Sequence, residues 1–197
     1  MGGSLNTTSS AEISGFKRAA DALTSARLMI AVAIALVAAF AGRRPAGTME
    51  VVLLLVLIGW TTDLFDGRLA RKDESGIKTR IGEADLAVDV AMDIAALAFF
   101  ATAGYIPWFA AAAYFLLAAT AILVWTNIAL ISMLELPVLA LHPVLAFIFV
   151  PRMGWLFAGW MLMAMFVNWK RMWEWIHLYL AGIGNLWRRL TRQPPRP

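Results

Sequence analysis

The chain has no cysteine and few charged residues. Of its 197 residues, 15% are charged and 61% are hydrophobic, and the mean hydropathy is +0.71. The absence of cysteine excludes disulfides and thiolate metal sites. A soluble domain is about a quarter charged, so this composition argues against one. Runs of about 20 apolar residues recur along the chain, which is the length that crosses a hydrocarbon core of about 30 Å.

These runs predict an all-α polytopic membrane protein with six transmembrane helices. We expect the spans at about residues 25–42, 49–65, 83–103, 108–132, 137–151 and 154–169. Basic amphipathic segments at the N- and C-terminal ends are typical of helices that lie on a membrane surface. The expected organisation is a flexible polar tail at 1–15, a six-helix membrane domain at 16–169 and a basic, tryptophan-rich interfacial segment at 170–197.

The net charge of +4 comes from lysine and arginine residues in the predicted loops and at the predicted helix ends. This distribution favours contact with the lipid bilayer and argues against nucleic acid as a partner. With six spans, both termini and the basic loop at 67–81 lie on one side, and the other side has only Arg43, Arg44 and Arg152. The positive-inside rule then predicts a multi-pass protein of the cell (inner) membrane whose termini and 67–81 loop face the cytoplasm.

Acidic residues gather where the second predicted span ends and the third begins. Asp63 and Asp66 are three residues apart, and Asp85, Asp89 and Asp93 are spaced by four. Each set therefore lies along one face of its helix. A short connection makes the two helices antiparallel neighbours, so we expect the two acidic faces to meet near the cytoplasmic surface.

A bound divalent cation explains these acids best. Each aspartate at mid-membrane costs about 2.5–3.5 kcal/mol, and like charges on successive helical turns repel each other. Ligands that offer only oxygen indicate hard cations such as Mg²⁺ or Mn²⁺. Asp73, Glu74 and Glu83 lie in the loop or at a helix start, and we interpret them as solvated charges.

The acidic stretch resembles the signature of the CDP-alcohol phosphotransferase (CDP-alcohol phosphatidyltransferase) family. That signature reads D-x2-D-G-x2-A-R, about eight residues, then G-x3-D-x3-D. The first part matches without a gap at Asp63, Asp66, Gly67, Ala70 and Arg71. Upstream, ADALTSARLMIA is similar to the family's N-x2-T-x2-R stretch, with Asp21 in place of asparagine. The resemblance covers residues 18–103, and six spans agree with the family fold.

The second half of the signature departs from the family spacing. Ten residues separate Arg71 from Gly82, and Gly82 precedes Asp85 by three positions. A helix start shifted by one residue accommodates this difference. We assign the paired acids of the family to Asp85 and Asp89, and the pair Asp89 and Asp93 remains the alternative.

The resemblance implies an integral membrane transferase of phospholipid biosynthesis. Such an enzyme moves a phosphatidyl or other phospho-alcohol group from a CDP-alcohol, for example CDP-diacylglycerol, to an acceptor alcohol and releases CMP. The resemblance also implies a homodimer and two Mg²⁺ or Mn²⁺ ions. A transporter or cation pathway and a non-catalytic relative are the alternatives, although a transporter is expected to carry acids near the middle of several spans.

The resemblance also implies the roles of individual residues. The metal ligands are expected to be Asp63, Asp66, Asp85 and Asp89, and Asp89 is also the expected general base. The residues expected to bind the CDP-alcohol are Asp63, Asp66, Gly67, Ala70, Arg71 and Gly82.

The acceptor is not identified by the sequence. No lysine or arginine occurs from Glu83 to Pro151, and an acceptor that is itself a phosphate ester is expected to be bound by basic residues. Arg27 and Arg80 are the nearest candidates for such a role. His142 lies in an apolar span, where we expect it to be packed and not a ligand.

The predicted topology can be tested at Ser75, in the middle of the basic loop. The protein lacks cysteine, so Ser75→Cys introduces the only thiol. We expect an impermeant thiol reagent to label this variant in inside-out vesicles and to leave it unlabelled in intact cells. Labelling from outside intact cells contradicts the predicted orientation.

Overall fold

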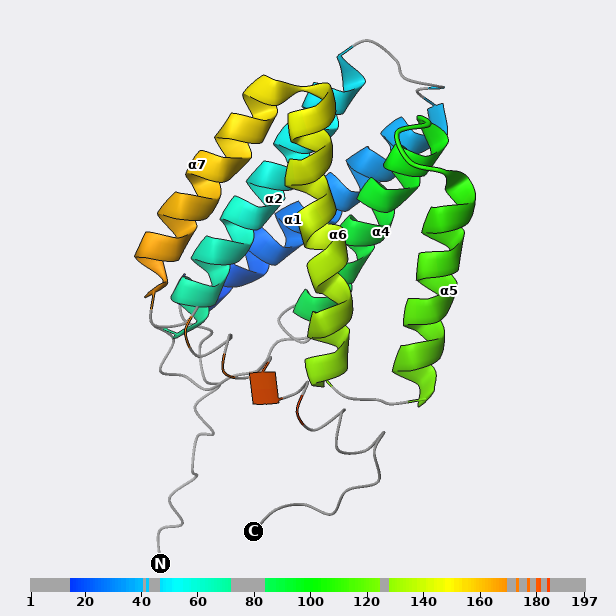
Figure 1. Ribbon diagram of the computed structural model, residues 1–197. Coiled ribbons are helices and arrows are strands. Elements are labelled where there is room, and N and C mark those ends of the chain that lie inside the picture. The colour runs from blue at the N-terminus through cyan, green and yellow to red at the C-terminus, as the bar shows by residue number, and fades with distance from the viewer. Residues whose placement is uncertain are drawn as a thin grey trace, which may run out of the picture.

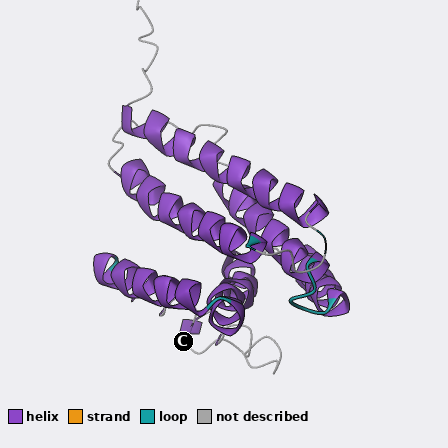
Figure 2. Cartoon of the chain, turned by 90° about the horizontal axis from the view of Figure 1, so that it is seen from above, coloured by secondary structure: helices purple, strands orange, loops and turns teal. Residues whose placement is uncertain are grey.

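The computed structural model describes residues 15–40, 42, 47–71, 84–124 and 128–169, together with single positions between 173 and 184. Within these residues the protein is helical and has no strand (Figures 1 and 2). The helices are α1 (Gly15–Phe40), α2 (Thr48–Arg71), α4 (Asp85–Thr102), α5 (Trp108–Val124), α6 (Ile128–Phe149) and α7 (Pro151–Val167). The all-helical prediction is confirmed for the part of the chain described.

Helix α1 packs against both α2 and α4 over much of its length, whereas α2 and α4 touch each other at few positions (Figure 1). The sequence predicts α2 and α4 as neighbours; they do touch, but α1 packs more extensively against each of them than they do against each other. Small buried residues on α1, Ala20 and Ala31, let the neighbouring backbones approach closely. The first helix therefore holds together the two helices that carry the acids.

The hydrophobic core lies between these three helices and extends to α6 and α7. Ile34 of α1 and Val52, Leu53 and Val56 of α2 are fully buried in it. Phe99 of α4 is fully buried among them, as are the rings of Phe100 and Phe157. Large side chains on α2 and α4 thus fill the space beside the small residues of α1, as close packing requires.

Helices α6 and α7 form a hairpin, and α7 packs against α2. Trp60 joins the two parts, because its ring makes edge contacts with His142 and Phe157. His142 is fully buried, and its Nδ1 donates to the Val138 carbonyl oxygen at 2.7 Å. This agrees with the expectation that His142 is a packed residue.

Two predicted boundaries differ from the structure. Helix α2 continues through Gly67 to Arg71, where the sequence predicts a loop from residue 67. Helix α6 begins at Ile128 and contains Pro137 and Pro143, although we place a span boundary at Pro137. A proline removes one backbone hydrogen bond and crowds the preceding turn, but helices in an apolar environment tolerate it where neighbouring groups satisfy the backbone.

Among the described residues, two segments are long and apolar enough to cross a membrane by length and composition, namely α1 and residues Thr48–Asp66 of α2. The apolar stretches Trp108–Ala121 and Leu134–Phe149 are shorter. Many large apolar side chains on α1, α5 and α7 are exposed, among them Met29, Phe40, Leu123 and Trp155. Such surfaces are typical of helices that face lipid or a partner. The count of six spans and the interfacial segment at 170–197 remain predictions.

The α6–α7 hairpin supplies a stability test at two glycines of α7. A Cβ added to Gly154 would lie 2.6 Å from the Phe147 ring and 2.9 Å from its Cα, whereas a Cβ at Gly159 meets nothing within 4 Å. We expect Gly154→Ala to destabilise the detergent-solubilised protein by about 1–3 kcal/mol. The control Gly159→Ala should keep or raise the melting temperature, because alanine favours a helix by about 1 kcal/mol over glycine. Equal melting temperatures of the two variants contradict the close contact between Gly154 and Phe147.

Candidate active site

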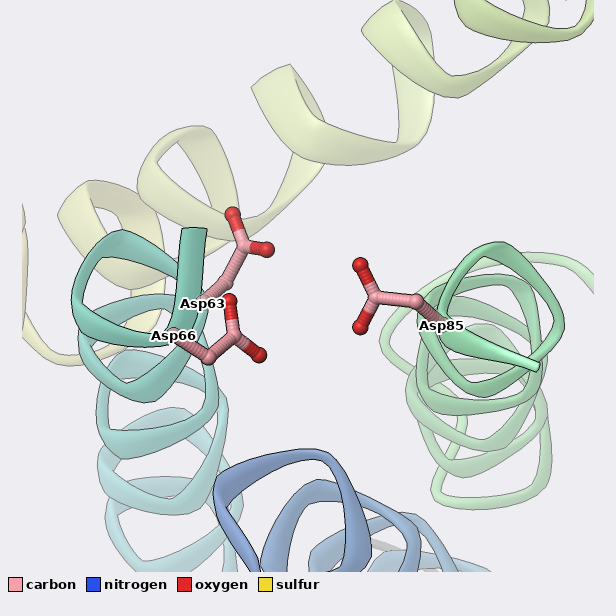
Figure 3. A group of neighbouring side chains, drawn as sticks. All are labelled: Asp63, Asp66 and Asp85. Atoms are coloured by element: carbon pink, nitrogen blue, oxygen red, sulfur yellow. The ribbon is translucent and has the colours of Figure 1, made fainter. Parts of the chain in front are cut away.

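Three of the predicted acids meet at one end of the helical bundle. Asp63 and Asp66 lie in the last turns of α2, and Asp85 is the first residue of α4. Each offers a carboxylate oxygen, and these atoms lie within 4.8 Å of one another. Figure 3 shows Asp63 and Asp66 projecting from α2 toward Asp85, which approaches from α4. The acidic faces of the two helices therefore meet, as the sequence predicts.

The guanidinium of Arg27, on α1, lies among these acids. Its Nη1 pairs with Asp63 at 3.1 Å and with Asp89, and its Nη2 pairs with Asp66 and Asp85. Each terminal nitrogen thus joins one carboxylate from α2 to one from α4. The planar guanidinium donates in fixed directions, so one side chain of α1 connects both acidic helices.

Thr24 lies one turn before Arg27 and faces the same acids. Its hydroxyl lies 3.4 Å from Asp66 Oδ2 and 3.3 Å from Asp85 Oδ1, so it can donate to either. Thr24 is not among the site residues predicted from the sequence. The signal for it was the T-x2-R spacing, since residues three apart share one helix face.

The cluster is closed on one side and open on the other. The side chain of Arg27 is fully buried and that of Asp66 is 6% exposed, whereas Asp85 is 42% and Asp63 54% exposed. Asp89 is intermediate. A ligand can therefore approach from the side of Asp63 and Asp85, while Arg27 and Asp66 form the floor.

The charge of the cluster suits a divalent cation. Among the described residues, four carboxylates face the one guanidinium of Arg27, and when all four are ionised this leaves a surplus of negative charge, which is costly in a partly buried place. The donor set consists of carboxylate oxygens without histidine, which is the ligand type of Mg²⁺ and Mn²⁺. The acids Asp63, Asp66 and Asp85 thus fit a metal ion, and Asp89 joins them through Arg27.

The remaining predicted residues are placed as follows. Gly67, Ala70 and Arg71 belong to the last two turns of α2, the helix of Asp63 and Asp66. Arg80 and Gly82 lie outside the described residues. Asp93 is not in the cluster, because it lines a separate cavity between α4, α5 and α6. The alternative pair of Asp89 and Asp93 therefore lacks support from the geometry.

The contacts of Arg27 lead to a stability prediction. Arg27→Met keeps a flexible, unbranched apolar side chain and removes the guanidinium that pairs with the four carboxylates. Breaking a buried charge network in this way costs about 3–5 kcal/mol, so the melting temperature in EDTA should fall markedly. Mn²⁺ should raise it more in the variant than in the wild-type protein, because the ion replaces the lost positive charge.

The matched control for this experiment is Arg152→Met. Arg152 is exposed and pairs with Glu50 at 3.5 Å, and such surface pairs contribute little. Its melting temperature and its response to Mn²⁺ should be those of the wild type. If the melting temperature falls equally in Arg27→Met and Arg152→Met, the ion pairs of Arg27 do not stabilise the protein as proposed.

Comparison with known proteins places the chain in a family. A family model described as CDP-alcohol phosphatidyltransferase matches residues 17–183, which include all the site residues. No curated protein and no solved structure matches the chain. The family comprises membrane-associated, generally metal-dependent transferases that use a CDP-alcohol donor and an alcohol acceptor in phospholipid synthesis. The match confirms the resemblance seen in the motif: the chain belongs to the CDP-alcohol phosphatidyltransferase family.

Proposed function

We propose that this protein transfers a phosphatidyl group from CDP-diacylglycerol, or a phospho-alcohol group from a related CDP-alcohol, to an acceptor alcohol and releases CMP. The observation that carries this proposal is the convergence of acids from α2 and α4 at one end of the bundle, with three carboxylate oxygens within 4.8 Å of one another. A transporter would need a path of polar groups through several spans. Here the four acids that pair with Arg27 gather toward the ends of two helices, which favours an enzyme.

The acids are proposed to bind two Mg²⁺ or Mn²⁺ ions. Asp63, Asp66 and Asp85 would hold them, with Asp89 as a partial ligand. When bound, such ions would supply positive charge that neutralises the pyrophosphate and stabilises the attacking and leaving oxygens. The open side of the cluster, at Asp63 and Asp85, gives the donor access to this position.

Asp89 is the proposed general base. It lies one turn beyond Asp85 on α4, it is less exposed than Asp85, and it pairs with Nη1 of Arg27. A carboxylate held in this way can accept the proton of the acceptor hydroxyl as that oxygen attacks phosphorus. A positioned base contributes typically about 10²–10⁴-fold to the rate.

The donor is proposed to bind along the end of α2. Arg71 follows Asp66 by five residues in the same helix, and a guanidinium suits phosphate oxygens because it donates two parallel hydrogen bonds. Gly67 and Ala70 are small, so a nucleotide can approach the helix backbone there. Gly82 is the further donor-binding residue that the resemblance implies.

Arg27 has two candidate roles. The sequence leads us to expect that Arg27, with Arg80, binds an acceptor phosphate. Its burial beneath four carboxylates favours a positioning role instead, because a phosphate at Arg27 would meet the surplus negative charge of the cluster. We therefore propose that Arg27 and Thr24 orient the acids.

The membrane setting completes the proposal. We propose a multi-pass protein of the inner membrane, with its active site toward the cytoplasm and with a homodimer as the assembly. Basic residues near the acidic end, including Arg68 and Arg71, support this orientation. The thiol-labelling experiment at Ser75 tests the orientation, and the molar mass in detergent tests the dimer.

Asp85 and Asp89 can be distinguished by enzyme kinetics. If Asp89 is mainly the base, Asp89→Asn should lower CMP release by about 10²–10⁴-fold at every Mn²⁺ concentration. Asp85→Asn should raise the Mn²⁺ concentration needed for half-maximal activity, and high Mn²⁺ should recover part of the rate. The measurement is CMP release against Mn²⁺ concentration with CDP-diacylglycerol and a panel of alcohols.

The control is Glu50→Gln, which removes a carboxylate from the first turn of α2, an end of that helix remote from Asp63 and Asp66. It should behave like the wild type. If Asp89→Asn is rescued by Mn²⁺ and Asp85→Asn is not, the roles of ligand and base are reversed.

A further inference from the structure

A cavity lies between α4, α5 and α6, next to the acidic cluster. Its volume is about 260 Å³, and its walls include Asp93 and Leu97 of α4, Tyr114, Phe115 and Ala118 of α5, and Glu135 of α6. The lining is almost entirely apolar, and Asp93 and Glu135 are its two residues with a carboxylate. Nothing in the metal cluster or the proposed chemistry uses Asp93 or Glu135.

The two carboxylates of the cavity have no cation beside them in the described structure. Among the described residues, Glu135 Oε1 is a buried oxygen without a hydrogen-bond partner. Asp93 is close enough to Glu135 and to Asp89 for their charges to repel each other. No lysine or arginine lines the cavity, and none occurs from Glu83 to Pro151. A buried acid of this kind needs either a compensating charge or a proton, and a bound cation supplies the first.

The aromatic wall of the cavity suits the same kind of ligand. Tyr114 and Phe115 lie beside the acids, and the faces of such rings attract cations, including quaternary ammonium groups. The Tyr114 hydroxyl donates to the Leu134 carbonyl oxygen, which fixes the ring between α5 and α6. A phosphate ester, by contrast, would be repelled by both carboxylates.

The cavity is placed correctly for an acceptor. Asp93 lies four residues beyond Asp89, which is a rise of about 6 Å along a helix. A small amino alcohol has its ammonium and hydroxyl groups separated by a few bonds. With the ammonium between Asp93 and Glu135, its hydroxyl points toward Asp89, the proposed base.

We propose that this cavity binds the ammonium group of a cationic acceptor alcohol, so that the acceptor is an amino alcohol. This inference rests on the proposed function. In the transfer step the acceptor oxygen forms a bond to the phosphorus that carries the lipid, and the phosphoanhydride bond to CMP breaks. The hydroxyl proton passes to Asp89, CMP leaves as the anion, and the ammonium keeps its charge throughout.

The first experiment compares acceptors that differ only in charge. Purified protein receives CDP-diacylglycerol, Mn²⁺ and either choline or its neutral carbon analogue 3,3-dimethyl-1-butanol, and CMP release is measured. Ethanolamine, glycerol and glycerol 3-phosphate are tested in parallel. We expect kcat/KM to be about 10-fold or more higher for the better of the two amino alcohols than for any neutral alcohol, because a charge pair in a desolvated site is worth that much. A preference for glycerol 3-phosphate, or equal rates with the neutral analogue, overturns the proposal.

Variants then test the cavity itself. Asp93→Asn and Glu135→Gln should each raise the KM for the amino alcohol about 10-fold and reduce its advantage over the neutral analogue. Ala118→Phe should raise the KM for both, because the added ring fills the cavity without changing its charge. Glu50→Gln is the control for loss of one carboxylate elsewhere and should leave the KM unchanged. An unaltered KM in both acid variants overturns the assignment.

A binding measurement separates this inference from the proposed function. Equilibrium dialysis with radiolabelled choline and ethanolamine, without donor, reports on the cavity alone. Binding that weakens in Asp93→Asn and Glu135→Gln but not in Glu50→Gln supports the site. Absence of binding to the wild-type protein overturns it. If none of the alcohols in the panel supports CMP release, the proposed function fails. The dialysis experiment still decides whether the cavity binds an ammonium group.

Discussion

The ion pairs of Arg27 are the interaction on which the arrangement of the site depends. One guanidinium on α1 reaches two carboxylates of α2 and two of α4, and each terminal nitrogen joins one of each. Without a positive charge in this place, four acids on two helices would repel each other. Helix α1 packs against both α2 and α4, which brings Arg27 to these acids. The Thr24 hydroxyl of the same helix lies within hydrogen-bond distance of Asp66 and Asp85.

The site combines a rigid floor with an open side. Arg27 and Asp66 are buried where three helices meet, so their positions are fixed by the packing below them. Asp63 and Asp85 are more exposed and remain accessible to a ligand. This division suits an enzyme that must keep its ligands in place and yet admit a nucleotide at the end of the bundle, because preorganised charges need no rearrangement during reaction.

Much of the site was predictable because the helical period places acids on one face. The spacing of Asp63 and Asp66, and that of Asp85 and Asp89, required only that each segment be a helix. The contribution of α1 could not be derived in this way, since spacing within one helix does not say which other helix it meets. Two helix boundaries were also missed, the extension of α2 to Arg71 and the start of α6 before Pro137. Glycine and proline disfavour helices on average, but apolar surroundings make a helix tolerate them.

By itself, the sequence determined the helical class, the acidic motif and the family, because composition, period and motif spacing are local properties of the chain. Only the tertiary structure decided that Arg27 lies beneath four of the acids, and that Asp93 lines a cavity with Glu135 instead of pairing with Arg27. The physical reason lies in the helix geometry. Residues spaced by four drift by about 40° per step, so Asp85 and Asp93 face different neighbours, and the packing of α1, α5 and α6 determines which neighbours those are.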